Sequence, residues 1–168
     1  MKQKVWIINH YAGNMFFEKG GRHYWFARFL REDGYEPVVI CCNAKHNSNS
    51  EEYFEINERK YIDKNAEEIS VPFIFVKSRP YSTNGKDRIL NMIDFYRNLL
   101  KVYKELSEIY GKPDIIYASS VHPLTLWAGI KIAKYYGIKC ICEIRDLWPE
   151  SIIAYGMIGQ NSMIAKSL

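Results

Sequence analysis

Short apolar runs alternate with segments of helical periodicity along most of this chain. The runs at residues 5–8, 36–42, 71–76, 114–119 and 138–144 are rich in β-branched residues and largely uninterrupted by polar ones. Such runs are typical of strands that a parallel sheet buries on both faces. Helices are predicted at residues 87–110 and 123–136, and a further helix follows Gly20-Gly21-Arg22, with its apolar positions between Tyr24 and Leu30 and its C-terminal stop at Gly34. The longest helix repeats its apolar residues at three- and four-residue steps. The pattern therefore predicts an α/β domain with a Rossmann-like, doubly wound parallel sheet and right-handed crossovers.

Three connecting segments carry no clear periodicity. Residues 9–19 are expected to be irregular, and residues 77–86 form a turn-rich loop around Asn84-Gly85. Residues 43–68 are polar and are expected to form a loop or a partly ordered excursion. Residues 161–168 resemble an N-cap and the first turns of a helix that stops early, so we expect residues 1–168 to be one domain of a longer chain.

Composition excludes some function classes. The net charge of +4 is mild and no long run of like charges occurs, so no nucleic-acid partner is expected. No apolar run approaches the roughly 20 residues that span a bilayer, so we expect a cytoplasmic protein that is soluble or peripheral to the inner membrane. The pairs Cys41-Cys42 and Cys140-x-Cys142 lack the spacing of zinc knuckles. We expect free, buried and reduced thiols.

The string Glu143-Ile144-Arg145-Asp146-Leu147-Trp148-Pro149-Glu150-Ser151 begins with the last two residues of the last predicted strand and runs straight into an Arg-Asp pair. Ligands of parallel α/β sheets bind at the carboxyl ends of strands, so an Arg-Asp pair and a tryptophan at this point predict a site. A buried Arg-Asp pair that merely orders the turn remains an alternative, and the two roles are compatible.

A second string, Gly20-Gly21-Arg22-His23, precedes the first predicted helix. Glycines let backbone N–H groups approach an anion, the start of a helix favours negative charge, and Arg22 adds a potential phosphate contact. The spacing matches no dinucleotide or Walker motif, so glycines that only ease the turn remain an alternative. His23 on its own is more typical of a surface or capping residue.

A third string, Ser119-Ser120-Val121-His122-Pro123, follows the fourth predicted strand. His122 opposite Asp146 would form an acid/base or hydroxyl-binding pair, with Ser120 beside it. The alternative is that Ser119 or Ser120 is a plain helix N-cap.

The long helix also carries basic residues, Arg88, Arg97, Lys101 and Lys104, beside its apolar stripe. Such a face can lie on an anionic membrane, although most such faces simply meet solvent. No Asp-x-Asp string suited to a metal diphosphate is present, so a metal-free mechanism is the default expectation.

Taken in order, and with Asn9-His10-Tyr11 after the first predicted strand, these strings resemble the N-terminal half of bacterial family 4 glycosyltransferases, the branch that acts in O-antigen, capsule and lipopolysaccharide assembly. The resemblance spans essentially the whole chain, and its most specific part is Arg-Asp-Leu-Trp-Pro-Glu-Ser. It implies a GT-B architecture of two Rossmann-like domains, in which the N-terminal domain chiefly binds the acceptor. It also implies a retaining, metal-independent transfer of a hexosyl or N-acetylaminosugar group.

The resemblance further implies roles for particular residues. Gly20, Gly21 and Arg22 would lie near the diphosphate of a nucleotide-sugar co-substrate, and His122 and Asp146 would line the acceptor side of the cleft. Arg145, Trp148 and Glu150 would support that wall. The acceptor would be lipid-linked or a growing polysaccharide. The family's Glu-x7-Glu donor element belongs to a second domain with no counterpart in these residues, so the isolated domain is expected to be inactive.

Two alternatives stay open at this point. The chain could be a standalone half-transferase or binding module that needs a separate donor-binding chain, or an unrelated nucleotide-binding α/β enzyme. Nothing in the sequence names the sugar, the acceptor or the linkage.

Overall fold

The computed structural model describes residues 2–44, 54–81, 85–120 and 122–145. Its strands are β1 (Lys4–Ile8), β2 (Glu36–Cys42), β3 (Tyr61–Ala66), β4 (Val71–Val76), β5 (Ile115–Ser120) and β6 (Lys139–Ile144). They form one six-stranded sheet in the order β3-β4-β2-β1-β5-β6. Every neighbouring pair is parallel except β3 with β4. The chain therefore has the predicted Rossmann-like α/β fold, with one antiparallel edge strand.

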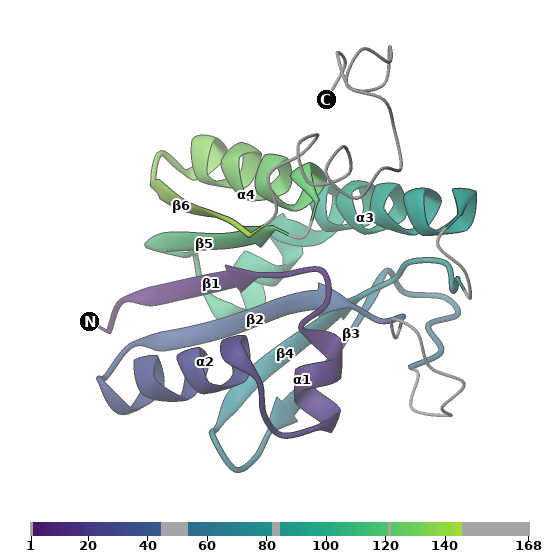
Figure 1. Cartoon of the computed structure of the whole chain (residues 1–168). Helices are drawn as coiled ribbons and strands as arrows, with labels where there is room; N and C mark the ends of the chain where they lie inside the picture. Colours follow the sequence, from purple (N-terminus) through teal and green to yellow (C-terminus); the bar gives the residue numbers. More distant parts are fainter. Residues whose placement is uncertain (1, 45–53, 82–84, 121, 146–168) are drawn as a thin grey trace.

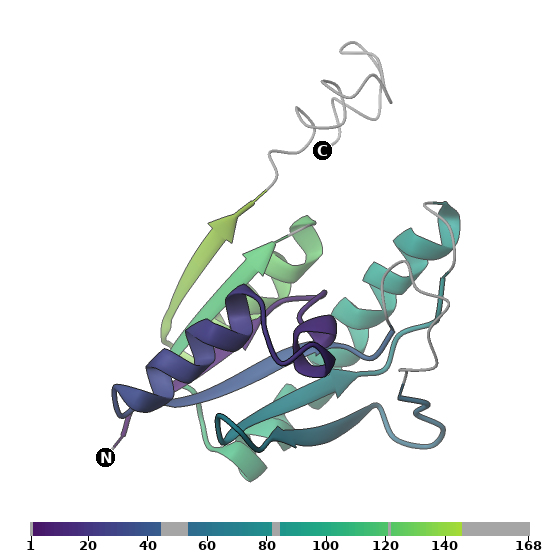
Figure 2. The ribbon, with the colours of Figure 1, turned by 60° about the horizontal axis from the view of Figure 1, so that its bottom comes forward.

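The helices cover both faces of the sheet. They are α1 (Gly13–Phe17), α2 (Arg22–Glu32), α3 (Lys86–Tyr110) and α4 (Pro123–Tyr136). In Figures 1 and 2, α1 and α2 lie on one face, and α3 and α4 on the other. Successive side chains of a strand point to opposite faces, so β1 sends Trp6 and Ile8 into the core under α3 and α4, and Val5 and Ile7 into the core under α1 and α2.

The three predicted helices are confirmed, with small shifts of their ends. α4 has the predicted bounds, α3 begins one residue early at Lys86, and α2 begins at Arg22 and ends two residues before the predicted stop at Gly34. Gly137 ends α4 in the left-handed conformation, with φ of 66°, which glycine adopts without steric cost.

Two short elements contradict the sequence prediction. β3 occupies part of the segment expected to be a loop, and it pairs with β4 in antiparallel fashion. As an edge strand it buries only its end residues, Tyr61 and Ala66. Its middle residues are polar, so the strand does not appear in the sequence as an apolar run. α1 lies in the segment expected to be irregular. It is too short to show helical periodicity, and its buried Gly13 fits because a Cβ there would lie 2.8 Å from the Cys42 carbonyl oxygen.

The four cysteines are free, but only two of them are buried as expected. Cys41 and Cys42 are buried in β2, whereas Cys140 is half-buried and Cys142 is exposed. The reason is position in the sheet: β6 is an edge strand in the described structure, and Ile141 and Ile144 are also exposed there. Within the described residues, no helix is both long and apolar enough to cross a membrane.

Candidate functional site

Side chains from β1, β5, β6 and α2 form a continuous polar chain at the carboxyl edge of the sheet. Asn9, which follows β1, donates from Nδ2 to the Ser119 carbonyl oxygen at 3.1 Å and faces its Oγ at 3.3 Å. Ser119 Oγ donates to Glu143 Oε2 at 2.6 Å, and Glu143 Oε1 pairs with the Arg22 guanidinium. The strings that the sequence marked after the strands and before α2 therefore meet at one place. We call Arg22, His23, Ser119 and Glu143 the Arg22 cluster.

Glu143 is the hub of the Arg22 cluster. Burial alone would raise its pKa, but hydrogen bonds from Ser119 and the Tyr117 hydroxyl, together with the charge of Arg22, hold the pKa below its usual range. Burial, and secondarily the hydrogen bond to the negatively charged Glu143, raises the pKa of Tyr117 to about 12. Glu143 is therefore a carboxylate at neutral pH. The sequence pattern gave this residue no role, although a carboxylate at the end of a predicted strand, two residues before Arg145-Asp146, was the available signal.

The start of α2 follows from its glycines. Gly21 is the N-cap residue, with φ of 87°, and a Cβ there would lie 2.9 Å from Met15 Cγ, so both conformation and space favour glycine. No side chain among the residues described caps the helix, and the His23 N–H lies against Met15 Sδ at 3.4 Å. Gly20 closes the preceding turn, where its N–H donates to the Met15 carbonyl oxygen.

His23 is fully buried, so the alternative of a surface residue is wrong, while its predicted part in binding a substrate or phosphate stays a prediction. Its side chain turns inward from the first turn of α2 toward Tyr117, with ring centroids 6.2 Å apart. Neither ring nitrogen has a hydrogen-bond partner among the residues described. Burial disfavours the charged ring and lowers the pKa of His23 to about 4, so the imidazole is neutral at physiological pH.

His122 lies next to His10, at the carboxyl ends of β5 and β1. The ring centroids are 4.8 Å apart, and His122 Nε2 lies 3.4 Å from Thr125 Oγ1. Its Nδ1 is buried and has no partner within the part of the chain that the structure describes. Burial, and secondarily the charge of Arg88, lowers the pKa of His122 to about 4. A neutral, buried imidazole can accept a hydrogen bond from a hydroxyl group.

Neither serine of the third string is an N-cap. Ser119 and Ser120 are buried residues of β5, and the N-cap of α4 is His122, which makes no side-chain capping bond. Their hydroxyls therefore belong to the sheet edge and not to the helix start, as the Ser119–Glu143 bond illustrates.

His10 was missed as a site residue. It is fully buried, and its Nε2 lies 2.7 Å from Asn91 Oδ1 on α3. Because Asn91 donates through Nδ2 to the Arg79 carbonyl oxygen, its Oδ1 must accept, which assigns the proton of His10 to Nε2. The signal in the sequence was a polar Asn9-His10 pair directly after a fully apolar strand.

Arg88 also differs from its expected place on a solvent-facing basic surface. It is half-buried and donates from Nε to the Tyr11 hydroxyl at 3.2 Å. Tyr81 contacts Tyr11 as well, and burial is the main cause that raises the Tyr81 pKa. Arg97, Lys101 and Lys104 are exposed, as expected.

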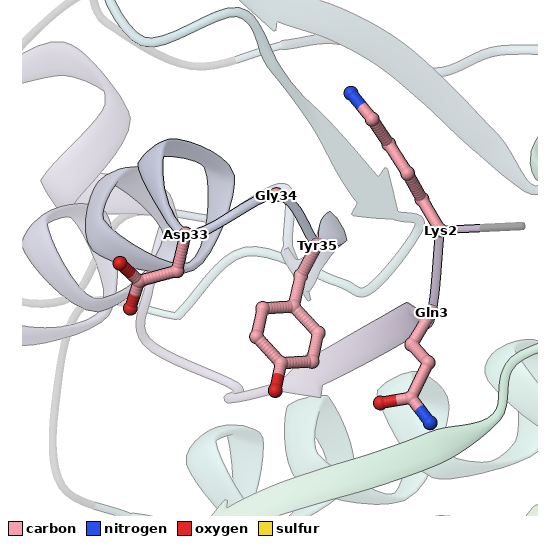
Figure 3. Close-up of a pocket in the computed structure, with 5 residues that line it drawn as sticks. All are labelled: Lys2, Gln3, Asp33, Gly34 and Tyr35. Carbon is pink, nitrogen blue, oxygen red and sulfur yellow. The ribbon is translucent and has the colours of Figure 1, made fainter.

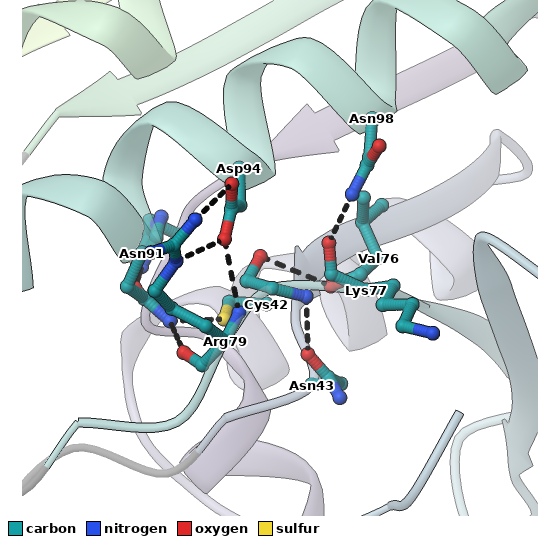
Figure 4. A network of polar contacts seen from close by, with 10 residues as sticks. Cys42, Asn43, Val76, Lys77, Arg79, Asn91, Asp94 and Asn98 are labelled. Atoms are coloured by element: carbon teal, nitrogen blue, oxygen red, sulfur yellow. Dashed lines mark hydrogen bonds and ion pairs between the residues drawn. The ribbon is translucent and has the colours of Figure 1, made fainter. Parts of the chain in front are cut away.

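A second polar group, between β2, β4 and α3, consists of Asn43, Ser78, Arg79, Asn91 and Asp94, and we call it the Asn91 cluster (Figure 4). Asn43 accepts from the Ser78 N–H at 2.8 Å and donates to the Phe54 carbonyl oxygen at 3.0 Å. The Asp94 carboxylate accepts from Arg79 Nε at 2.6 Å and Nη2 at 3.3 Å. These bonds tie the loop after β4 to α3.

A surface hollow of about 500 Å3 lies at the opposite, amino edge of the sheet (Figure 3). Its walls are Lys2, Gln3, Asp33, Gly34 and Tyr35, which precede β1 and β2. The hollow contains none of the residues that the sequence marked as functional. We therefore place the candidate site at the carboxyl edge, where the polar side chains converge.

The remaining predicted site residues are only partly placed. Arg145 is exposed just beyond the end of β6, and its positive charge lowers the pKa of His23 as a secondary cause. Asp146, Trp148 and Glu150 lie outside the described residues, so the predicted pairing of His122 with Asp146 stays a prediction. Among the residues described, no three His, Cys, Asp or Glu side chains gather as a metal site would require.

Comparisons with known proteins inform the fold alone. No protein-family model matches the sequence, and no curated protein matches it significantly. The structure is similar to the C-terminal domain (residues 78–226) of PF1911 hydrogenase from Pyrococcus furiosus, with a TM-score of 0.53 and 14% sequence identity. The similarity covers 86% of this chain and 93% of that domain. At this identity it supports the α/β architecture and carries no information on activity.

Proposed function

We propose that this chain is the acceptor-binding domain of a retaining, nucleotide-sugar-dependent glycosyltransferase that assembles cell-surface polysaccharide. The observation that carries the proposal is the polar chain from Asn9 through Ser119 and Glu143 to Arg22. It brings together three strings that lie far apart in the sequence and that resemble, in the same order, those of family 4 glycosyltransferases. The edge where they meet is also where α/β sheets of this kind bind ligands.

The chemistry of the edge suits a hydroxylated, diphosphate-bearing acceptor. The uncapped start of α2 and the mostly exposed Arg22 side chain offer backbone N–H groups and a guanidinium to phosphate oxygens. The neutral imidazole of His122, beside Ser120, offers an acceptor for a sugar hydroxyl. Arg22 and the start of α2 would in addition stabilise the negative charge of the diphosphate that leaves the donor. This stabilisation would not require these residues to hold a metal ion.

Binding of an acceptor analogue to this 168-residue chain tests the proposal. We would titrate a short-chain prenyl diphosphate that carries one sugar and follow the amide and imidazole NMR signals. The signals of Arg22, His23, Ser120 and His122 should move together, and those of Gln3 and Gly34, at the amino-edge hollow, should stay in place. Movement confined to the hollow, or no binding at millimolar concentration, would remove the acceptor assignment.

The donor half of the proposal needs a separate probe. Since the resemblance assigns most donor contacts to a second domain, uridine and guanosine diphosphates should bind this chain only weakly. Low-micromolar binding of either nucleotide would instead favour an unrelated nucleotide-binding α/β enzyme.

A further inference from the structure

A carboxylate occupies the centre of the site that we assign to an anionic ligand. Glu143 Oε1 pairs with the Arg22 guanidinium, and the glutamate side chain is 17% exposed while the arginine side chain is 60% exposed. Glu143 also accepts hydrogen bonds from Ser119 Oγ and from the Tyr117 hydroxyl. Glu143 therefore stays anchored without Arg22, whereas among the contacts described Arg22 has only this ion pair to hold its head group.

This asymmetry decides which partner moves when an anion arrives. A phosphate group offers Arg22 stronger, bidentate hydrogen bonds than a single carboxylate oxygen does. Arg22 can turn toward solvent to reach it, because most of its side chain is already exposed. Glu143 cannot follow, because two further hydrogen bonds hold it on the sheet. The ligand would then lie close to a fixed negative charge.

We propose that Glu143 is the resident counter-ion of Arg22 and a specificity-determining residue, one that an anionic ligand must displace from the arginine. The inference rests on the proposed function, since it refines the diphosphate site. In the free protein Glu143 neutralises Arg22 and keeps weak anions off the α2 start. In the complex it repels the ligand in proportion to ligand charge, so it sets an upper limit on the affinity for diphosphates.

Calorimetric titration with inorganic pyrophosphate tests the proposal. Glu143→Gln keeps the shape of the side chain and can keep a hydrogen bond from Ser119, but it removes the charge. A unit charge within a few ångströms of a bound anion at a partly exposed site changes the binding constant by about tenfold, so the variant should bind pyrophosphate about tenfold more tightly. Sulfate, which carries less charge, should gain less.

Glu36→Gln is the matched control. Glu36 forms the same kind of ion pair, with Lys4 Nζ at 2.5 Å, but at the amino edge of the sheet. Its substitution should leave pyrophosphate affinity unchanged. Arg22→Gln combined with Glu143→Gln should bind pyrophosphate more weakly than Glu143→Gln alone, because the arginine that is set free supplies part of the additional affinity.

The outcomes separate the inference from the proposed function. Wild-type binding that depends on Arg22, with unchanged or weaker binding by Glu143→Gln, would overturn the counter-ion role and leave the anion site standing. Absence of pyrophosphate binding in every variant at millimolar concentration would overturn both.

A measurement on the wild-type chain guards against a misfolded variant. On addition of pyrophosphate the Arg22 Nε–H signal should shift, while the ring signals of Tyr117, which report its bond to Glu143, should stay. Joint displacement of the Tyr117 signals would show that Glu143 leaves with the arginine, and would overturn the proposal.

Discussion

The Asn91 cluster and the Arg22 cluster lie at the same edge of the sheet but differ in how completely their polar groups are paired. In the Asn91 cluster, Asn43 and Asn91 each use both the oxygen and the nitrogen of the amide, and Asp94 accepts from Arg79. In the Arg22 cluster, His23 is fully buried with neither ring nitrogen bonded to a described residue, and Arg22 is mostly exposed.

The difference teaches which cluster holds the fold and which is available to a ligand. Buried polar groups in native proteins are almost always paired, so a fully paired cluster is sufficiently explained by stability. A buried group without a partner costs free energy in the free protein and calls for another explanation, such as a ligand or water. We infer that the Asn91 cluster is scaffold and that the Arg22 cluster is site, and mutations can separate the two.

The largest expected effect is on stability, from Asn91→Leu. The substitution leaves the buried His10 Nε2–H and the Arg79 carbonyl oxygen without their partner and should lower the free energy of unfolding by roughly 3 kcal/mol. Urea denaturation measures it. Asn98→Leu is the control, since half-buried Asn98 makes one bond to the described residues, to the Lys77 carbonyl oxygen at 2.7 Å, and the substitution should cost roughly 1 kcal/mol. Equal losses in the two variants would contradict a special role for Asn91.

The next effect is the pH dependence contributed by His23. Burial holds its pKa at about 4 in the folded state against 6.5 in the unfolded state, so the unfolded chain binds more protons between these values. The contribution of the neutral His23 ring to the free energy of unfolding is therefore fully present above pH 6.5. It falls as the pH drops toward 4, by roughly 3 kcal/mol for a pKa shift of this size. His23→Leu should flatten this part of the curve.

The same variant asks whether His23 serves the fold or a ligand. Because the imidazole has no described partner, a leucine of similar size should leave stability at pH 7 unchanged or improved. A large loss at pH 7 would mean that the ring has a structural partner after all. His122 has a similar depressed pKa, so His122→Leu in the same series shows how much of the remaining acid sensitivity belongs to that residue.

The sequence predicted the scaffold better than the site. Continuous apolar runs located β1, β2, β4 and β5, because burial on both faces leaves a strong local signal. The run of β6 was located in the same way, although this edge strand is largely exposed among the described residues. β3 escaped because an edge strand is stabilised mainly through its backbone pairing, while Asp63, Lys64 and Asn65 remain exposed. The local sequence indicates which residues are buried, but it does not indicate which strands pair through their backbones.

The site was found in outline because strand ends and glycines are local features, whereas its contacts are not. Glycines before a helix were enough to mark Arg22, and position after a strand was enough to mark His122. That Arg22 pairs with Glu143, and that His10 faces His122, depends on strand order, which brings residues more than a hundred positions apart into contact. The burial of His23 likewise follows from the packing of α2 against the sheet, and no neighbouring residue announces it.

The smallest expected effect compares two arginines of similar chemistry. Arg79 pairs with Asp94 through two nitrogens and joins a loop to α3, whereas Arg22 meets Glu143 through one described contact. Arg79→Gln should lower the Tm by roughly 2 °C, because an exposed bidentate pair contributes little, and Arg22→Gln should leave the Tm within error. Differential scanning calorimetry measures both. If Arg22→Gln were the more destabilising of the two, the ion pair with Glu143 would be part of the scaffold, and the distinction between the two clusters would fail at its central residue.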